Sequence, residues 1–63
     1  MKSLKEMNEA INCMEAHKEA IEEWQEGAMT DVWRDEQGIL CIKYESGKWW
    51  RYRSSKGGFV EWW

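Results

Sequence analysis

Residues 39–53 read ILCIKYESGKWWRYR, and this stretch decides the fold. On both sides of the turn Glu45-Ser46-Gly47, side chains alternate in character with a period of two, which is typical of antiparallel strands joined by a tight connection. The connection is either a two-residue loop, Ser46-Gly47, or a three-residue loop that includes Glu45 and places glycine in the bulge position.

The two loop lengths predict different strand registers. The three-residue loop places Ile42 opposite Trp50 and Leu40 opposite Tyr52, so that apolar residues share one face. The two-residue loop places Ile42 opposite Arg51 and mixes the faces. Because a slip of one residue sends every side chain to the other face, we predict the three-residue loop.

The period of two continues outward from this hairpin in both directions. Clusters of turn residues at 35–38, 45–47 and 54–58 separate the strands. The strands are expected at about 28–34, 39–45, 48–54 and 59–63. Odd loop lengths at the other turns would preserve the same separation of faces.

Residues 3–26 have the apolar spacing of an amphipathic helix. Ser3 followed by Glu6 forms a capping box at the start, and Gly27 is the natural residue after the end. The apolar stripe consists of Leu4, Met7, Ile11, Met14, Ile21 and Trp24, with Ala10 and Ala20 between them. We predict an α+β fold in which this helix packs on one face of a three- to four-stranded antiparallel meander, as one small domain, 1–63.

This register predicts one covered and one uncovered sheet face. The face that the helix covers carries Val32, Leu40, Ile42, Tyr44, Trp50, Tyr52, Val60 and Trp62. The opposite face carries Asp31, Trp33, Cys41, Lys43, Trp49, Arg51, Arg53, Phe59, Glu61 and Trp63.

The uncovered face is the candidate binding surface. Guanidinium groups stacked on the rings would explain why aromatic residues are tolerated there, but not why there are four of them. Exposed apolar surface of this extent, rich in tryptophan and arginine, is typical of interaction sites. The expected partner is a protein or a second copy of the chain, and the alternative is single-stranded nucleic acid. The residues expected to bind are Trp33, Lys43, Trp49, Arg51, Arg53, Phe59 and Trp63.

A second candidate surface is acidic. Like charges follow one another at helical i, i+4 spacing in two rows, Glu15, Glu19 and Glu23, and Glu22 and Glu26. The rows form either a solvated face or a docking surface for a basic partner, in the latter case as a mimic of nucleic-acid phosphates.

Charge divides unevenly along the chain. Residues 1–26 carry seven glutamates against three lysines, whereas residues 27–63 carry six basic and five acidic groups, and the net charge is −3. This balance disfavours a dedicated duplex-DNA binder, which would normally be basic.

Few residues could support catalysis or metal binding. Cys13, Cys41 and the lone His17 form no cluster of three or four ligands, so we expect no metal, no cofactor and no enzyme activity. His17 is expected to be a solvent-facing or boundary residue, and the cysteines are expected to be free core residues rather than a bridge between helix and sheet. No apolar run reaches the roughly 20 residues that span a bilayer, so we expect a soluble, cytoplasmic protein without membrane contact.

Two broad resemblances exist. The order of one helix followed by strands resembles the outline of double-stranded RNA-binding domains, which add a C-terminal helix and a basic helix start. The size, acidity and α+β plan are similar to those of small inhibitors and accessory proteins of phages and mobile elements, including anti-CRISPR proteins. These resemblances imply a small binding or inhibitory protein and assign a role to no individual residue.

Overall fold

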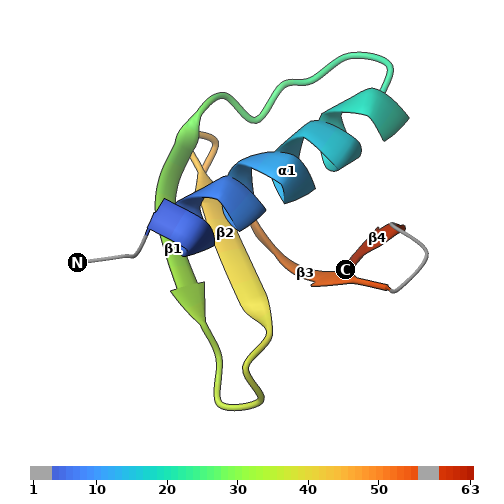
Figure 1. Cartoon of the computed structure of the whole chain (residues 1–63). Coiled ribbons are helices and arrows are strands. Elements are labelled where there is room, and N and C mark those ends of the chain that lie inside the picture. Colours follow the sequence, from blue (N-terminus) through green and yellow to red (C-terminus); the bar gives the residue numbers. More distant parts are fainter. Residues whose placement is uncertain (1–3, 56–58) are drawn as a thin grey trace.

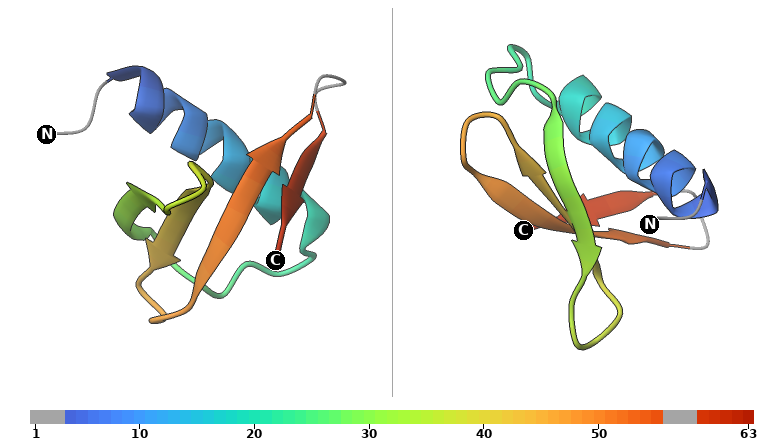
Figure 2. Two further views of the ribbon diagram at one scale, coloured as in Figure 1. Left: turned by 90° about the horizontal axis from the view of Figure 1, so that it is seen from below. Right: turned by 90° about the vertical axis from the view of Figure 1, so that its left-hand side faces the viewer.

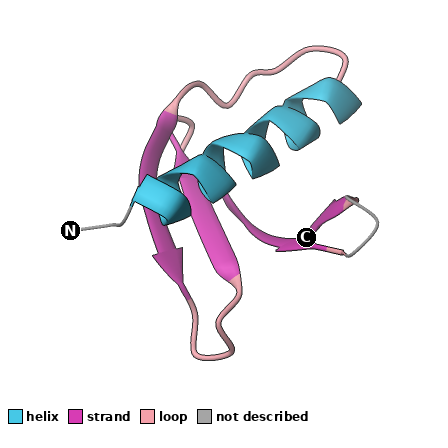
Figure 3. Cartoon of the chain, viewed as in Figure 1, coloured by secondary structure: helices cyan, strands magenta, loops and turns pink. Residues whose placement is uncertain are grey.

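The computed structural model describes residues 4–55 and 59–63 and shows one helix followed by four strands in that part of the chain. The strands form a single antiparallel sheet in the order β1-β2-β3-β4, and α1 crosses one of its faces (Figures 1 and 3). The predicted α+β meander is therefore confirmed. The elements are α1 (Leu4–Ala20), β1 (Met29–Arg34), β2 (Leu40–Tyr44), β3 (Trp49–Ser54) and β4 (Val60–Trp62).

The hairpin between β2 and β3 has the predicted register. Ile42 lies opposite Trp50, and Leu40 lies opposite Tyr52. At the turn, the Gly47 N–H donates to the carbonyl of Tyr44 at 2.9 Å. Gly47 has a φ of 90°, which only glycine adopts without strain, so the three-residue loop is built around this glycine.

The hairpin between β1 and β2 has the same three-residue loop with the same pattern of backbone hydrogen bonds. The Asp35 N–H donates to the Ile39 carbonyl, and the Gly38 N–H donates to the Asp35 carbonyl, both at 3.0 Å. The Asp35 carboxylate also accepts the N–H groups of Gln37 and Ile39, at 2.8 and 3.0 Å. Two hairpins with loops of equal, odd length keep the same residues on the same face across three strands.

The core lies between α1 and the face of the sheet that was expected to be covered. Of the eight residues predicted there, Val32, Leu40, Ile42, Tyr44 and Tyr52 are at most 4% exposed. Trp50, Val60 and Trp62 pack around them as half-buried residues. All eight predicted core positions are thus confirmed.

The helix presents a different face to the sheet from the one its apolar pattern indicated. Ala10, Cys13 and His17 are its buried residues, whereas Leu4 and Ile11 are 80% and 38% exposed. Small side chains at 10 and 13 let α1 approach the bulky rings of the sheet closely. The stripe that contains Leu4 and Ile11 is therefore a flank of the helix and not its core face.

The predicted end of the helix near residue 26 is wrong, because α1 ends at Ala20. At about 1.5 Å per residue, a helix over 3–26 would be about 36 Å long. The Cα trace extends only 28 × 28 × 21 Å, so such a helix would project beyond the sheet. Stopping at Ala20 also relieves the repulsion among glutamates at a helix C-terminus, where negative charge is unfavourable.

Trp24 returns to the core from the loop after α1. Its ring packs edge-on against His17 and Tyr44, with ring centroids 5.0 and 5.1 Å apart. Its Nε1–H donates to the Gly27 carbonyl at 2.9 Å. Gly27, expected to cap the helix, instead lies in this loop with a φ of 82°.

The two cysteines are free and buried. Cys13 belongs to the core between α1 and the sheet, whereas Cys41 belongs to the opposite face. A bridge between helix and sheet is excluded by this arrangement, because a disulfide needs the two Cβ atoms about 3.5–4.5 Å apart. None of the helices in the described part of the chain is long and apolar enough to cross a membrane.

Candidate functional site: the open face of the sheet

We use the name open face for the side of the sheet that lies away from α1. In the described part of the chain, α1 lies on the other side (Figure 2), and Trp24 from the loop after α1 packs against the core there. Strand pairing aligns the side chains of the open face into rows, with Lys43 opposite Trp49 and Arg51 opposite Cys41. Strand pairing places Trp33, Lys43, Trp49, Arg51, Arg53 and Trp63 on this face, and Phe59, the seventh residue predicted to bind, directly precedes β4.

The most central contact of the open face joins two strands that are not neighbours. Trp33 on β1 and Trp49 on β3 meet over β2, with ring centroids 5.4 Å apart. Cys41 on β2 pairs with Trp33 and is only 1% exposed, although α1 lies on the other side of the sheet. Burial raises the pKa of the Cys41 thiol, which favours its neutral form.

Arginine side chains hold the aromatic rings in place. The Arg51 guanidinium lies 4.7 Å from the centroid of the Trp49 ring, and that of Arg53 lies 5.9 Å from Trp63. Arg53 also donates to the Glu61 carboxylate at 2.6 Å, within the cross-strand pair that these two residues form. The expected stacking of guanidinium groups on rings is therefore present, at about 0.5–1 kcal/mol per exposed contact.

This stacking leaves much aromatic surface in water. Trp49 remains 43% exposed, Trp63 52% and Phe59 75%. Trp33 is half-buried by its contact with Trp49. The mutual backbone hydrogen bonds of Arg51 and Trp63, at 3.1 and 3.2 Å, hold Trp63 in the sheet. The exposed rings are thus carried by paired strands, which gives the surface a defined shape.

The acidic residues do not form the continuous helical surface that their spacing indicated. Glu15 and Glu19 lie on α1, whereas Glu22, Glu23 and Glu26 lie in the loop after it. Glu26 is half-buried and accepts the hydroxyl hydrogen of Ser46 at 2.6 Å. Only Glu15 and Glu19 keep the i, i+4 spacing of a helix. Neither of the two expected rows of glutamates therefore runs in full along α1.

A buried polar chain lies on the core side of the sheet, and sequence reasoning missed it. His17 Nδ1 is 2.7 Å from the Tyr52 hydroxyl, which is 2.7 Å from the Tyr44 hydroxyl. His17 is 3% exposed, so its expected solvent-facing or boundary position is wrong. The one available signal was its position: His17 follows Cys13 by four residues and Ala10 by seven, on one face of the helix.

Aromatic rings surround His17 on several sides. Trp62 stacks on its imidazole with centroids 4.5 Å apart, and Trp24 and Trp50 pack edge-on, each at 5.0 Å. Burial lowers the pKa of His17, with Glu26 acting weakly in the opposite direction. Burial and the mutual hydrogen bond raise the pKa of Tyr52. All three groups are therefore neutral near pH 7, and they form a hydrogen-bonded network within the core.

The described residues include one histidine, two cysteines and several acidic side chains. No three histidine, cysteine, aspartate or glutamate side chains among them are grouped so that they could hold a metal ion. Comparison with protein families, with curated proteins and with solved structures found no match to this chain. A functional proposal therefore depends on the geometry of its own side chains.

Proposed function

We propose that this chain is a small, non-catalytic binding module that docks a protein partner on the open face. The observation that supports the proposal is the joint exposure of Trp49 and Trp63 on one side of a sheet whose other side is filled by the core, with Phe59 exposed directly before β4. Partly exposed aromatic anchors beside arginine are the residue types that dominate binding energy at protein interfaces. An inhibitor or accessory protein that acts by occupying a partner's surface requires no more than this.

The balance of charges on the open face favours a protein over nucleic acid. Lys43, Arg51 and Arg53 share the face with Asp31 and Glu61, and Arg53 is already neutralised by Glu61 at 2.6 Å. A surface that tracks a phosphate backbone normally carries an uncompensated row of cations. Mixed charges around an apolar centre are typical of protein interfaces.

Single-stranded nucleic acid is a second candidate because of one local feature. Arg51 stacks on Trp49, and Lys43 lies directly opposite Trp49 on the neighbouring strand. A base could stack on the free side of the ring while the two cations contact its phosphates. Titration of tryptophan fluorescence with mixed-sequence single strands at low and near-physiological salt separates the two candidates. Salt-sensitive quenching would favour nucleic acid, and an unchanged spectrum would leave the protein partner.

The protein-binding proposal is tested with three alanine variants in affinity capture from lysate and in sedimentation. Trp49→Ala should lose the captured partner, or the self-association, while it keeps the melting temperature. Leu4→Ala is the matched control, since Leu4 is 80% exposed but lies on α1. Trp50→Ala should instead lower the melting temperature, because Trp50 packs against His17 and Tyr44.

Two results would contradict the proposal. If Trp49→Ala destabilised the fold as much as Trp50→Ala, the exposed ring would be structural. If Trp49→Ala and Leu4→Ala retained the same partners and the same oligomeric state as the wild type, the open face would not be the interface.

A further inference from the structure

β1 is an outer strand, and its free edge carries backbone groups that point away from the sheet. Its ladder with β2 is antiparallel, and the Asp35 N–H donates to the Ile39 carbonyl at the end of that ladder. Backbone hydrogen bonds in such a ladder alternate, so Val32 and Arg34 direct their N–H and C=O groups toward the free edge. In the described part of the chain, no strand lies beyond β1.

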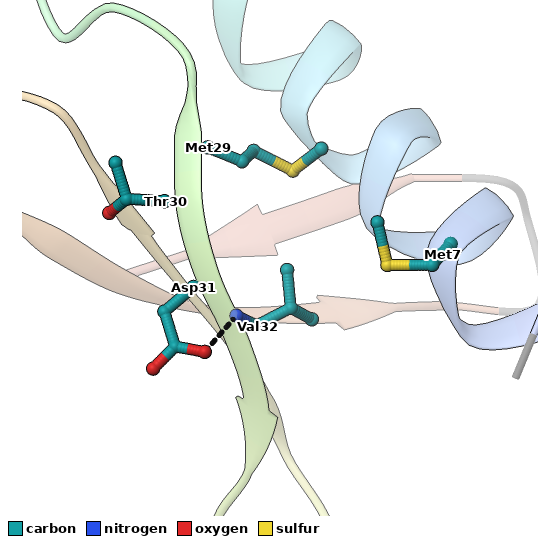
Figure 4. Close-up of a pocket in the computed structure, with 5 residues that line it drawn as sticks. All are labelled: Met7, Met29, Thr30, Asp31 and Val32. Atoms are coloured by element: carbon teal, nitrogen blue, oxygen red, sulfur yellow. Dashed lines mark hydrogen bonds between the residues drawn. The ribbon is translucent and has the colours of Figure 1, made fainter. Parts of the chain in front are cut away.

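A pocket of about 260 Å³ opens beside this edge, between α1 and β1. Figure 4 shows Met7 from α1 and Met29 and Val32 from β1 pointing into the same space. Drug-sized ligands usually occupy about 300–1,000 Å³, so this pocket suits a single apolar side chain. Methionine walls adapt to the shape of such a side chain.

The apolar wall continues along α1 on both sides of Met7. Leu4 precedes Met7 by three residues and Ile11 follows it by four, which places all three on one flank of the helix. Leu4 is 80% exposed and Ile11 38%. This flank is the part of the apolar stripe that does not pack against the core.

Asp31 adds a negative charge and a protective contact to the same edge. Its Oδ1 accepts the N–H of Val32 at 2.9 Å, so the carboxylate occupies an edge donor that would otherwise be available to a strand. Asp31 is the one charged residue among those that line the pocket, and within the described residues it forms no ion pair. Natural sheets commonly protect outer strands with charged side chains of this kind.

We propose that the free edge of β1 and the adjoining pocket bind an extended peptide segment of a partner protein. The peptide adds a strand beside β1, inserts an apolar side chain between Met7 and Val32, and presents a lysine or arginine to Asp31. This mode combines main-chain hydrogen bonds for affinity with a side-chain pocket for specificity. The site borders the open face at Asp31 and Trp33, but its pocket lies on the side of α1, and it does not depend on the function proposed for the open face.

The sequence preference of the peptide follows from strand geometry. Successive side chains of a strand point to opposite sides of the sheet. The apolar residue must point to the side of α1, where the pocket lies. Its immediate neighbours then point to the side of Asp31 and Trp33, so the basic residue is adjacent to the apolar one in the sequence. Trp33 offers a ring on which that cation can also stack.

Binding exchanges one hydrogen-bond partner for another. A carbonyl of the peptide accepts the Val32 N–H in place of the Asp31 carboxylate, and the carboxylate turns to the cation of the peptide. The Val32 N–H keeps a hydrogen-bond acceptor throughout, and the Asp31 carboxylate gains an ion pair with the cation of the peptide.

The test is an NMR titration of the full chain with a degenerate nonapeptide pool that has Lys-Leu-Lys at its centre and serine, threonine and valine elsewhere. We expect backbone shifts at Val32 and Arg34 and methyl shifts at Met7 and Met29, with the indole N–H signal of Trp63 unchanged. Met7→Arg should weaken binding by about tenfold or more, equivalent to 1.4 kcal/mol or more. The matched control, Ile11→Arg on the same helix, should weaken it much less, because Ile11 does not line the pocket.

The contribution of charge is tested by a double-mutant cycle. The Lys-Leu-Lys pool should bind the wild type about three- to fivefold more tightly than a Gln-Leu-Gln pool, as expected for an exposed ion pair. Asp31→Asn keeps an oxygen for the Val32 N–H and should remove this difference. No shift at millimolar peptide, shifts confined to the open face, or concentration-dependent shifts at β1 without peptide would each overturn the proposal, the last in favour of a second copy of the chain.

Discussion

His17 illustrates how a single residue can take its properties from distant parts of the chain. Its hydrogen-bond partner Tyr52 is 35 residues away, and its ring neighbours come from the loop after α1 and from β3 and β4. With neutral His17, Nδ1 can accept from Tyr52, which in turn accepts from Tyr44. Protonation would force Nδ1 to donate, so the hydrogen bond between His17 and Tyr52 would have to reverse direction and the Tyr52 hydroxyl hydrogen would need another acceptor.

The pH dependence of stability follows from the lowered pKa of His17. The folded protein binds this proton less readily than the unfolded chain, whose histidine pKa is about 6.5. Stability from this group is therefore complete above about pH 6.5 and falls as pH decreases toward the folded pKa, by up to about 1.4 kcal/mol per pH unit. Urea unfolding between pH 7.5 and 5 should show this slope in the wild type. A His17→Phe variant should lack it, and an equal slope in that variant would assign the effect to other groups.

Gly27 is required for two reasons that can be separated by substitution. Its φ is 82°, and a Cβ atom there would lie 2.7 Å from Glu45 Oε1, the oxygen that accepts the Ala28 N–H at 2.7 Å. Gly38 has a similar φ of 79°, but no atom lies within 4 Å of the corresponding Cβ position.

Alanine at the two glycines should therefore have unequal effects. Gly38→Ala should cost about 1 kcal/mol, the penalty of a left-handed backbone for alanine. Gly27→Ala should cost more, because Glu45 must also move and release the Ala28 N–H. The free energy of unfolding in urea measures both. Equal losses would show that the contact with Glu45 contributes nothing.

At the scale of elements, α1 is placed by its small residues and by an ion pair. Ala10 is fully buried, whereas Ile11, next to it, is 38% exposed. Arg34 at the end of β1 contacts Glu9 at 2.5 Å and Glu6 at 3.4 Å and so joins the first turns of the helix to the sheet. The small residues at positions 10 and 13 let α1 approach the rings of the sheet closely, and His17 packs among those rings one turn further along the helix.

This arrangement reverses the usual expectation for two neighbouring apolar residues. Ala10→Leu should destabilise the protein by about 1–3 kcal/mol, because the packed core has no space for the added atoms. Ile11→Ala should change stability by about 1 kcal/mol or less, even though it removes more apolar surface from the chain. Thermal unfolding of the two variants provides the comparison. A larger loss for Ile11→Ala would mean that the helix is rotated toward its apolar stripe.

At the scale of the whole molecule, the sheet separates the chain into two chemical environments. Cys13 lies on the core side and Cys41 on the open face, and burial raises the pKa of both thiols. Because the sheet lies between them, the two thiols cannot form a disulfide with each other while the sheet is intact.

Mild oxidation should therefore leave the folded protein without an internal disulfide. We expect an unchanged intact mass after treatment with oxidised glutathione, and two free thiols when the protein is subsequently unfolded and titrated. The Cys13→Ser variant, treated in the same way, is the control for intermolecular pairing through Cys41. A loss of two hydrogens from the folded monomer would contradict the placement of the cysteines on opposite faces.

The sequence by itself determined the sheet. Glycines at the third position of two equal loops and the alternation around them were enough to predict that Ile42 opposes Trp50, because these signals are local and a register error would bury Arg51. The division of the sheet into a core face and an open face, including the seven candidate binding residues, followed from that register.

Only the tertiary structure decided which face of α1 is buried and where the helix stops. Leu4 and Ile11 have the spacing of core residues, but the space above the large rings of the sheet accepts only Ala10, Cys13 and His17. The burial of His17, the return of Trp24 to the core and the pocket beside β1 depend on contacts between residues far apart in the chain. Such contacts leave no periodic signal, because they are set by the volume that remains after helix and sheet have packed.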